Sequence, residues 1–168
     1  MLWRDDSVDG IKTGHTSSAG YCLVVSALRN NMRLISVVLG STSVKARNQD
    51  TQTLLNFGFR FYDTYKIYDA GKTLKTVSVW KGSKNIFPIG LEEDMYITIP
   101  KGQYDNVEAT LDIREMIEAP VTSGEAYGSV QLKLGEREVA SNPVIALESV
   151  DIGGVWTRTL DGNRLWFK

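Results

Sequence analysis

The most informative stretch of the chain is Val8-Asp9-Gly10-Ile11-Lys12-Thr13-Gly14-His15-Thr16. Its alternating residues predict a strand over residues 7–13 that leads into the triplet Lys12-Thr13-Gly14. Such a strand offers an ammonium and a hydroxyl to a carboxylate, and the glycine lets a ligand backbone approach closely. The triplet alone is common by chance, so its meaning depends on the sequence around it.

Two apolar runs follow, over residues 20–28 and 32–39, separated by the polar Arg29-Asn30-Asn31. This pattern predicts an antiparallel hairpin. Residues 43–62 begin with capping residues and continue with apolar positions such as Leu54 and Leu55. We therefore expect a helix there that packs one face on the hairpin.

After Asp63 the sequence pattern changes to short apolar runs separated by glycine and proline. Such runs are typical of a small β-sandwich or barrel. We predict two domains, 1–63 and 64–150, followed by a tail over 151–168 that could form an amphipathic helix. The predicted strands lie at 76–80, 95–99, 107–113, 128–134 and 144–150.

The composition excludes several classes of function. The chain has 19 Lys and Arg against 20 Asp and Glu, so it has no overall basic field, and nucleic acid is not expected as a partner. Its one cysteine, Cys22, cannot form an internal disulfide, and no cysteines and histidines stand at metal-ligand spacing. We expect no metal and no other cofactor. We also find neither a signal peptide in residues 1–10 nor an apolar stretch long enough to span a membrane.

Residues 8–16, with Ala19-Gly20-Tyr21 and residues 32–40, resemble the last strands of the low-molecular-mass penicillin-binding proteins, the D-alanyl-D-alanine carboxypeptidases. The resemblance continues through that domain's closing helix and into the family's second, all-β domain. It implies an α+β fold, in which a remnant of a transpeptidase or β-lactamase-like domain precedes a small all-β sandwich. The further matching stretches are residues 45–47, 56–61, 79–80, 97–102, 119–120 and 128.

The resemblance implies a serine-type peptidase of the cell envelope, or periplasm, that removes the terminal D-alanine from peptidoglycan pentapeptides and is acylated by β-lactams. Matched by position, Lys12 and Thr13 would bind the substrate carboxylate, and Gly14 and His15 would line the cleft. Arg47 falls where the family has an arginine that assists carboxylate recognition. Two alternatives stay open: His15 as an exposed loop residue, and Arg47 as one partner of an ion pair on the helix surface.

The family's nucleophile is the serine of an S-x-x-K pair that lies far upstream of the Lys-Thr-Gly strand. Only eleven residues precede Lys12, so we expect this chain to lack the nucleophile and to be inactive alone. Ser78-Val79-Trp80-Lys81 and Ser83-Lys84-Asn85 mimic the missing motifs. Because positions i and i+3 of a strand point to opposite faces, we read this likeness as coincidence.

Three functions remain open from the sequence. The first is part of a D-Ala-D-Ala carboxypeptidase, whose partner is a peptidoglycan pentapeptide or a β-lactam. The second is a non-catalytic β-sandwich that acts as a spacer or interaction module, and the third is a minimal esterase or β-lactamase-like hydrolase built on Ser78 and Lys81. The remnant should also expose apolar surface, which predicts a homodimer. The tail is shorter and less apolar than the family's membrane anchor, which leaves membrane attachment open.

Overall fold

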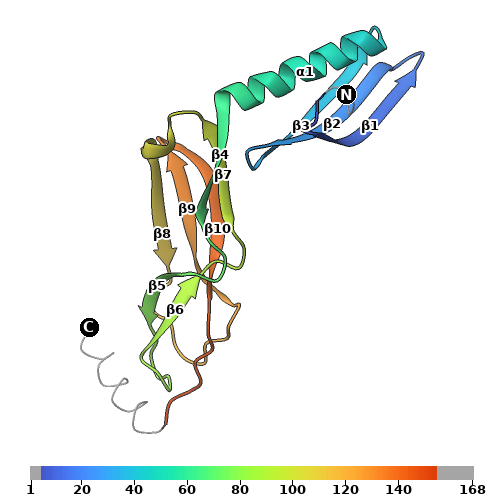
Figure 1. Cartoon of the computed structure of the whole chain (residues 1–168). Coiled ribbons are helices and arrows are strands. Elements are labelled where there is room, and N and C mark those ends of the chain that lie inside the picture. Colours follow the sequence, from blue (N-terminus) through green and yellow to red (C-terminus); the bar gives the residue numbers. More distant parts are fainter. Residues whose placement is uncertain (1–4, 155–168) are drawn as a thin grey trace. The chain divides into compact units, whose positions relative to one another are not determined.

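The structure, a computed structural model, describes residues 5–154. The chain divides into two compact units (Figure 1). The first contains the described residues up to Thr64 together with Thr98–Gly102, and the second contains Tyr65–Ile97 and the described residues from Gln103 onward. The expected order of strands and one helix, followed by an all-β part, is confirmed.

The first unit is built on an antiparallel sheet with the strand order β1-β2-β3. Its strands are β1 (Val8–Thr16), β2 (Gly20–Arg29) and β3 (Met32–Ser41). Asn30 and Asn31, which connect β2 to β3, have φ values of +47° and +64°. Two left-handed residues in a two-residue turn match the right-handed twist of the strands, so the predicted hairpin is confirmed.

Helix α1 (Val44–Phe61) follows, as the sequence predicts. Ser43 caps it, because the Ser43 side chain accepts a hydrogen bond from the Ala46 amide at 3.0 Å. Leu55 points into the core and is 1% exposed. The sheet and the helix share one hydrophobic core, formed by Val8, Leu23, Val25, Ala27 and Leu55, with Leu34 and Phe59 packed against it.

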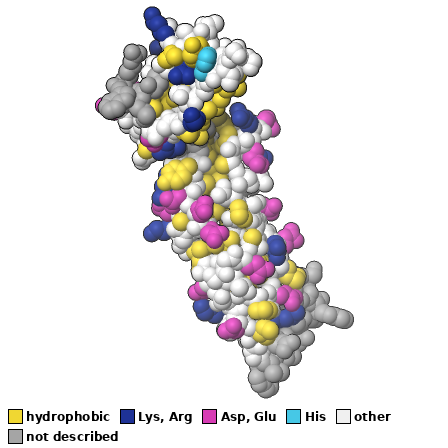
Figure 2. Space-filling model, turned by 90° about the vertical axis from the view of Figure 1, so that its right-hand side faces the viewer, with side chains coloured by type: hydrophobic (Ala, Val, Ile, Leu, Met, Phe, Trp, Pro, Cys, Tyr) yellow, Lys and Arg dark blue, Asp and Glu magenta, His cyan; other side chains and the backbone are white. Residues whose placement is uncertain are grey.

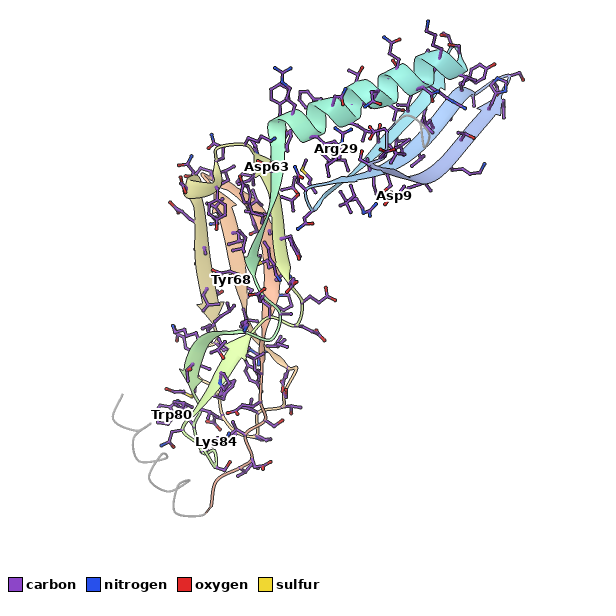
Figure 3. All side chains as sticks on the ribbon, viewed as in Figure 1. Asp9, Arg29, Asp63, Tyr68, Trp80 and Lys84 are labelled. Carbon is purple, nitrogen blue, oxygen red and sulfur yellow. The ribbon has the colours of Figure 1, made fainter. Side chains whose placement is uncertain are left out.

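A second set of contacts holds the segment before β1. The Asp5 carboxylate accepts a hydrogen bond from the Ser7 hydroxyl and forms an ion pair of 2.7 Å with Arg29 at the end of β2. The Ser7 hydrogen bond is the largest of the effects that lower the pKa of Asp5 to about 2. The Arg29 guanidinium, labelled in Figure 3, also lies 4.4 Å from the centre of the Phe59 ring on α1. Asp5 is therefore tied to the sheet and, through Arg29, to the helix.

The second unit has a five-stranded sheet in the order β5-β6-β10-β9-β8. Its centre is fully buried at Phe87, Ile89, Leu132 and Val144, each 0% exposed. The strands are β5 (Thr73–Ser78), β6 (Ile86–Gly90), β8 (Val107–Ile113), β9 (Ala126–Leu134) and β10 (Arg137–Ala146).

A two-stranded sheet pairs β4 (Tyr62–Tyr68) with β7 (Met95–Pro100), and each of these strands has residues in both units. A 3-10 turn (Tyr104–Asn106) precedes β8. In β7 the residues alternate between buried and exposed, so the side chains of Met95, Ile97 and Ile99 lie on one face of the strand and are buried. The strand predicted over 95–99 lies within β7.

The strands differ from the prediction in several places. β4 and β6 were not expected, β5 is Thr73–Ser78 whereas the predicted strand ran from 76 to 80, and β10 ends at Ala146 whereas the predicted strand ran from 144 to 150. Pro88 lies inside β6 and Pro143 inside β10, although the sequence pattern places both prolines between predicted strands. Pro143 is tolerated because β6 pairs with β10 only at Ile145 and Ala146, so near Pro143 the strand is bonded to β9 alone.

Among residues 5–154, no helix is both long and apolar enough to cross a membrane. The amphipathic helix expected in the tail falls mainly on residues 155–168, which lie outside the described residues.

Replacement of Leu55 by alanine should destabilise the first unit by about 2 to 5 kcal/mol, because it leaves a cavity under α1. The measurement is urea unfolding followed through the NMR signals of β2 amides, which report on the first unit alone. Leu54→Ala is the matched control, since Leu54 is the preceding residue and is 49% exposed. We expect it to change the free energy of unfolding by less than about 0.5 kcal/mol. Equal effects of the two substitutions would contradict the packing described above.

Candidate functional site

The Lys-Thr-Gly triplet lies on β1, which is an edge strand of its sheet in the described structure. In the register of the sheet, Lys12 pairs with Val24 and Thr13 with Leu23 on β2. All residues from Ile11 to Thr16 are exposed. The outer edge of β1 therefore presents polar side chains and backbone hydrogen-bonding groups to solvent, which is the arrangement to which an extended peptide can add.

Adjacent residues of β1 point to opposite faces of the sheet. Thr13 shares the face of Leu23, which packs on α1, whereas Lys12 shares the opposite face with Val24. The Lys12 ammonium donates a hydrogen bond to the Thr13 carbonyl at 3.0 Å. It forms no ion pair with any carboxylate of residues 5–154. Its charge is thus available to an anionic ligand at the strand edge.

Arg47 lies in the first turn of α1 and reaches the same strand. Its Nη1 donates to the Gly14 carbonyl at 3.4 Å and to the Cys22 carbonyl at 3.2 Å. Its Nε is buried and has no hydrogen-bond partner. The structure therefore brings Arg47 against the strand that carries Lys12, although the two residues are 35 positions apart in the sequence (47 − 12).

The His15 imidazole lies on the Tyr21 ring, with 4.0 Å between the ring centres and an angle of 30° between the planes. His15 is the only histidine in the chain, and Figure 2 shows its side chain at the surface beside hydrophobic and basic side chains. The sequence alone indicates no role for Tyr21. The register that pairs Tyr21 with His15 is what places the two rings together.

Ser78 and Lys81 belong to the second unit, whereas Lys12, His15 and Arg47 belong to the first. Ser78 is the exposed last residue of β5. Lys81 follows the strand, and its ammonium lies 2.8 Å from the Glu118 carboxylate. Trp80, between them, forms an isolated bridge with Glu118 and is labelled in Figure 3. The Lys81 charge is therefore engaged with a carboxylate.

The part of the chain that the structure describes has no group of three His, Cys, Asp or Glu side chains that could hold a metal ion. Cys22 is a free, half-buried thiol whose sulfur lies 3.5 Å from the Ala19 carbonyl. The end of β1 thus carries a hydroxyl and an imidazole on the face that packs on α1, with the Arg47 guanidinium beside them, and the Lys12 ammonium on the opposite face. Donors and cations of these kinds are suited to binding a carboxylate.

Two family models match the chain. Residues 62–151 match the penicillin-binding protein 5 C-terminal domain, and residues 1–43 match D-alanyl-D-alanine carboxypeptidase. Taken together, the two matches cover the strands of the first unit and nearly all described residues of the second.

Curated relatives and solved structures agree with the models. The chain is 34% identical over 169 residues to the D-alanyl-D-alanine carboxypeptidase DacA of Escherichia coli, covering 99% of this chain and 42% of that protein. The DacA protein of Haemophilus influenzae is 39% identical over 164 residues, which are 96% of this chain and 42% of that protein. The chain thus spans about two fifths of these relatives.

The crystal structure of penicillin-binding protein 5 from Haemophilus influenzae superimposes with a TM-score of 0.83 and 40% identity, covering 89% of this chain and 44% of that one. A Streptococcus pneumoniae protein, penicillin-binding protein 3, is 22% identical with a TM-score of 0.68, which shows the fold alone. The chain therefore belongs to the penicillin-binding protein 5 C-terminal domain family, and it corresponds in sequence and fold to the carboxy-terminal portion of a low-molecular-mass penicillin-binding protein, a D-Ala-D-Ala carboxypeptidase.

Proposed function

We propose that this chain forms the Lys-Thr-Gly side of the substrate cleft of a D-Ala-D-Ala carboxypeptidase of the cell envelope. The observation that carries the proposal is β1 itself, an exposed edge strand whose Lys12 ammonium is not engaged by any described carboxylate. The ligand is the terminal carboxylate of a peptidoglycan pentapeptide, or the equivalent carboxylate of a β-lactam.

In this proposal each residue of the triplet has a separate task. The carboxylate lies along the free edge of β1, where it accepts hydrogen bonds from the Lys12 ammonium on one face and the Thr13 hydroxyl on the other. Charge-assisted bonds of this kind are about twice as strong as neutral ones. Gly14 leaves room for the peptide backbone beside β1. Arg47 fixes the Gly14 end of the strand by binding its carbonyl, and the exposed His15 side chain lines the cleft beside it.

Acyl transfer requires in addition an activated hydroxyl next to a base. In this proposal the activated serine belongs to the part of the carboxypeptidases that this chain does not span. The chain supplies binding and orientation, and the second unit acts as the spacer that carries this strand.

Lys12→Ala should abolish most substrate recognition. The test uses a chimaera in which this chain replaces the corresponding 42% of Escherichia coli DacA. We expect kcat/KM for a D-Ala-D-Ala peptide to fall by about 10- to 150-fold, which is the effect of losing one hydrogen bond to a charged group. Lys133→Ala is the control, since Lys133 is an exposed lysine of the second unit. An inactive parent chimaera, or an active one that tolerates Lys12→Ala, would refute the proposal.

The alternatives are a purely structural module and a minimal hydrolase that uses Ser78. We expect the purified chain to form no covalent adduct with a fluorescent penicillin and not to turn over a p-nitrophenyl ester, because the Lys81 ammonium is paired with Glu118. Intact-mass spectrometry measures the adduct. An adduct that disappears in Ser78→Ala would establish the minimal hydrolase instead.

We also propose that two copies of the chain by itself associate through the face of the sheet opposite α1, a face that also carries Lys12, so that this association and substrate binding exclude each other. Three large apolar residues of β3 are exposed there: Ile35 is 64%, Val37 54% and Leu39 72% exposed. The alternation of β3 places them on one face, so they form a continuous apolar strip.

Light scattering at micromolar concentration should therefore report a dimer. Val37→Lys should convert the dimer to a monomer, because it introduces a charge into the apolar strip. Thr110→Lys, at an exposed position of β8 in the second unit, is the control and should leave the dimer intact. A monomer in the unmodified chain would rule out this association.

A further inference from the structure

Tyr21 lies at the beginning of β2, where the register pairs it with His15 on β1 and with Ser41 on β3. The preceding residue, Gly20, has a φ of +65°, and a Cβ at this position would lie 3.0 Å from the Ser41 carbonyl oxygen. Glycine is the residue that adopts this conformation readily and fits this space. The backbone at Gly20 therefore fixes the position at which the Tyr21 side chain begins.

The Tyr21 ring interacts with two residues of the candidate site. It stacks on the His15 imidazole with 4.0 Å between ring centres, and the Arg47 Cζ lies 5.8 Å from its centre. The two rings are in close contact, slightly nearer than the usual separation of about 4.5–7 Å, and the Arg47 distance is within the range of about 6 Å for cation–π attraction. One ring thus joins an imidazole on β1 to a guanidinium on α1.

Arg47 depends on this ring because its hydrogen bonds are weak. The bonds from Nη1 to Gly14 and Cys22 measure 3.4 Å and 3.2 Å, at or beyond the long end of the usual range for N–H···O bonds. Its Nε is buried without a partner, which is an unfavourable position for a charged donor. The guanidinium therefore needs a further contact to stay at the Gly14 end of β1.

We propose that Tyr21 is a positioning residue, whose ring holds Arg47 and His15 in the arrangement that presents the Gly14 end of β1 to the substrate carboxylate. This inference rests on the proposed function, since the arrangement matters for catalysis only if β1 binds the substrate. It deepens that function because the positions of Arg47 and His15 in the binding site would depend on Tyr21, a side chain that makes no polar contact with the ligand. The ring, and not the hydroxyl, performs the task.

The test measures kcat and KM of the DacA chimaera with a D-Ala-D-Ala peptide. Tyr21→Leu keeps an apolar side chain but removes the ring, and we expect it to raise KM about tenfold while kcat changes by less than about twofold. Tyr21→Phe keeps the ring and should remain within about twofold of the parent for both constants. Phe57→Leu is the matched control, because Phe57 is a 55% exposed aromatic residue of the same unit, and it should change neither constant.

Two further measurements separate positioning from a loss of folding. In an Arg47→Ala background, Tyr21→Leu should add less than about twofold to KM, because the two residues act together. In the chain itself, NMR should show the His15 imidazole protons shifted by the Tyr21 ring current, and Tyr21→Leu should remove this shift while the β2 amide signals stay dispersed.

An inactive parent chimaera would overturn the proposed function and this inference with it. An active parent whose KM is unchanged by Tyr21→Leu would overturn this inference alone. The same holds for a Tyr21→Leu variant that loses its dispersed β2 signals, because the ring would then serve the fold and not the site.

Discussion

The first unit depends on the burial of one face of a three-stranded sheet under α1. Leu55 supplies the centre of this contact, and Leu23, Val25 and Ala27 supply the sheet side of it. Burial of apolar surface is non-directional, so it does not by itself fix the helix along the sheet. Contacts with a defined geometry lie at the ends of the helix, where Arg47 makes long hydrogen bonds to carbonyls of β1 and β2 and lies 5.8 Å from the Tyr21 ring, and Arg29 lies over Phe59.

This arrangement explains why β1 can be a binding strand. β1 is bonded to β2 on one side, and the helix covers the sheet mainly through β2 and β3. β1 therefore contributes little to the core beyond Val8. A strand that buries few side chains can have polar residues along its length. The residues from Lys12 to Thr16 are exposed for this reason.

Much of the fold could be predicted from local sequence. The hairpin and the helix follow from signals that act within a few residues: the Asn30-Asn31 turn, the Ser43 cap and the apolar spacing of α1. The strands that contain Pro88 and Pro143 were missed or misplaced, because whether a proline fits in a strand depends on which neighbours the strand has in the sheet. Near Pro143, β10 is bonded to β9 alone. For the same reason the role of Tyr21 was not visible, since His15 and Arg47 meet it only through strand register and helix packing.

Both units contain ion pairs, and Arg29 with Asp5 is an example in the first unit. In the second unit Lys66 is bonded to both Asp69 and Asp94, and these contacts raise the pKa of Lys66 and lower the pKa of Asp94. Exposed pairs of this kind add little stability, but they engage the Lys66 ammonium fully with carboxylates. Lys12, by contrast, forms no ion pair with a carboxylate of residues 5–154 and lies on an edge strand. The Lys12 ammonium donates one hydrogen bond, to the Thr13 carbonyl, and so keeps capacity for a charge-assisted bond to an anionic ligand, on which the proposed role of β1 depends.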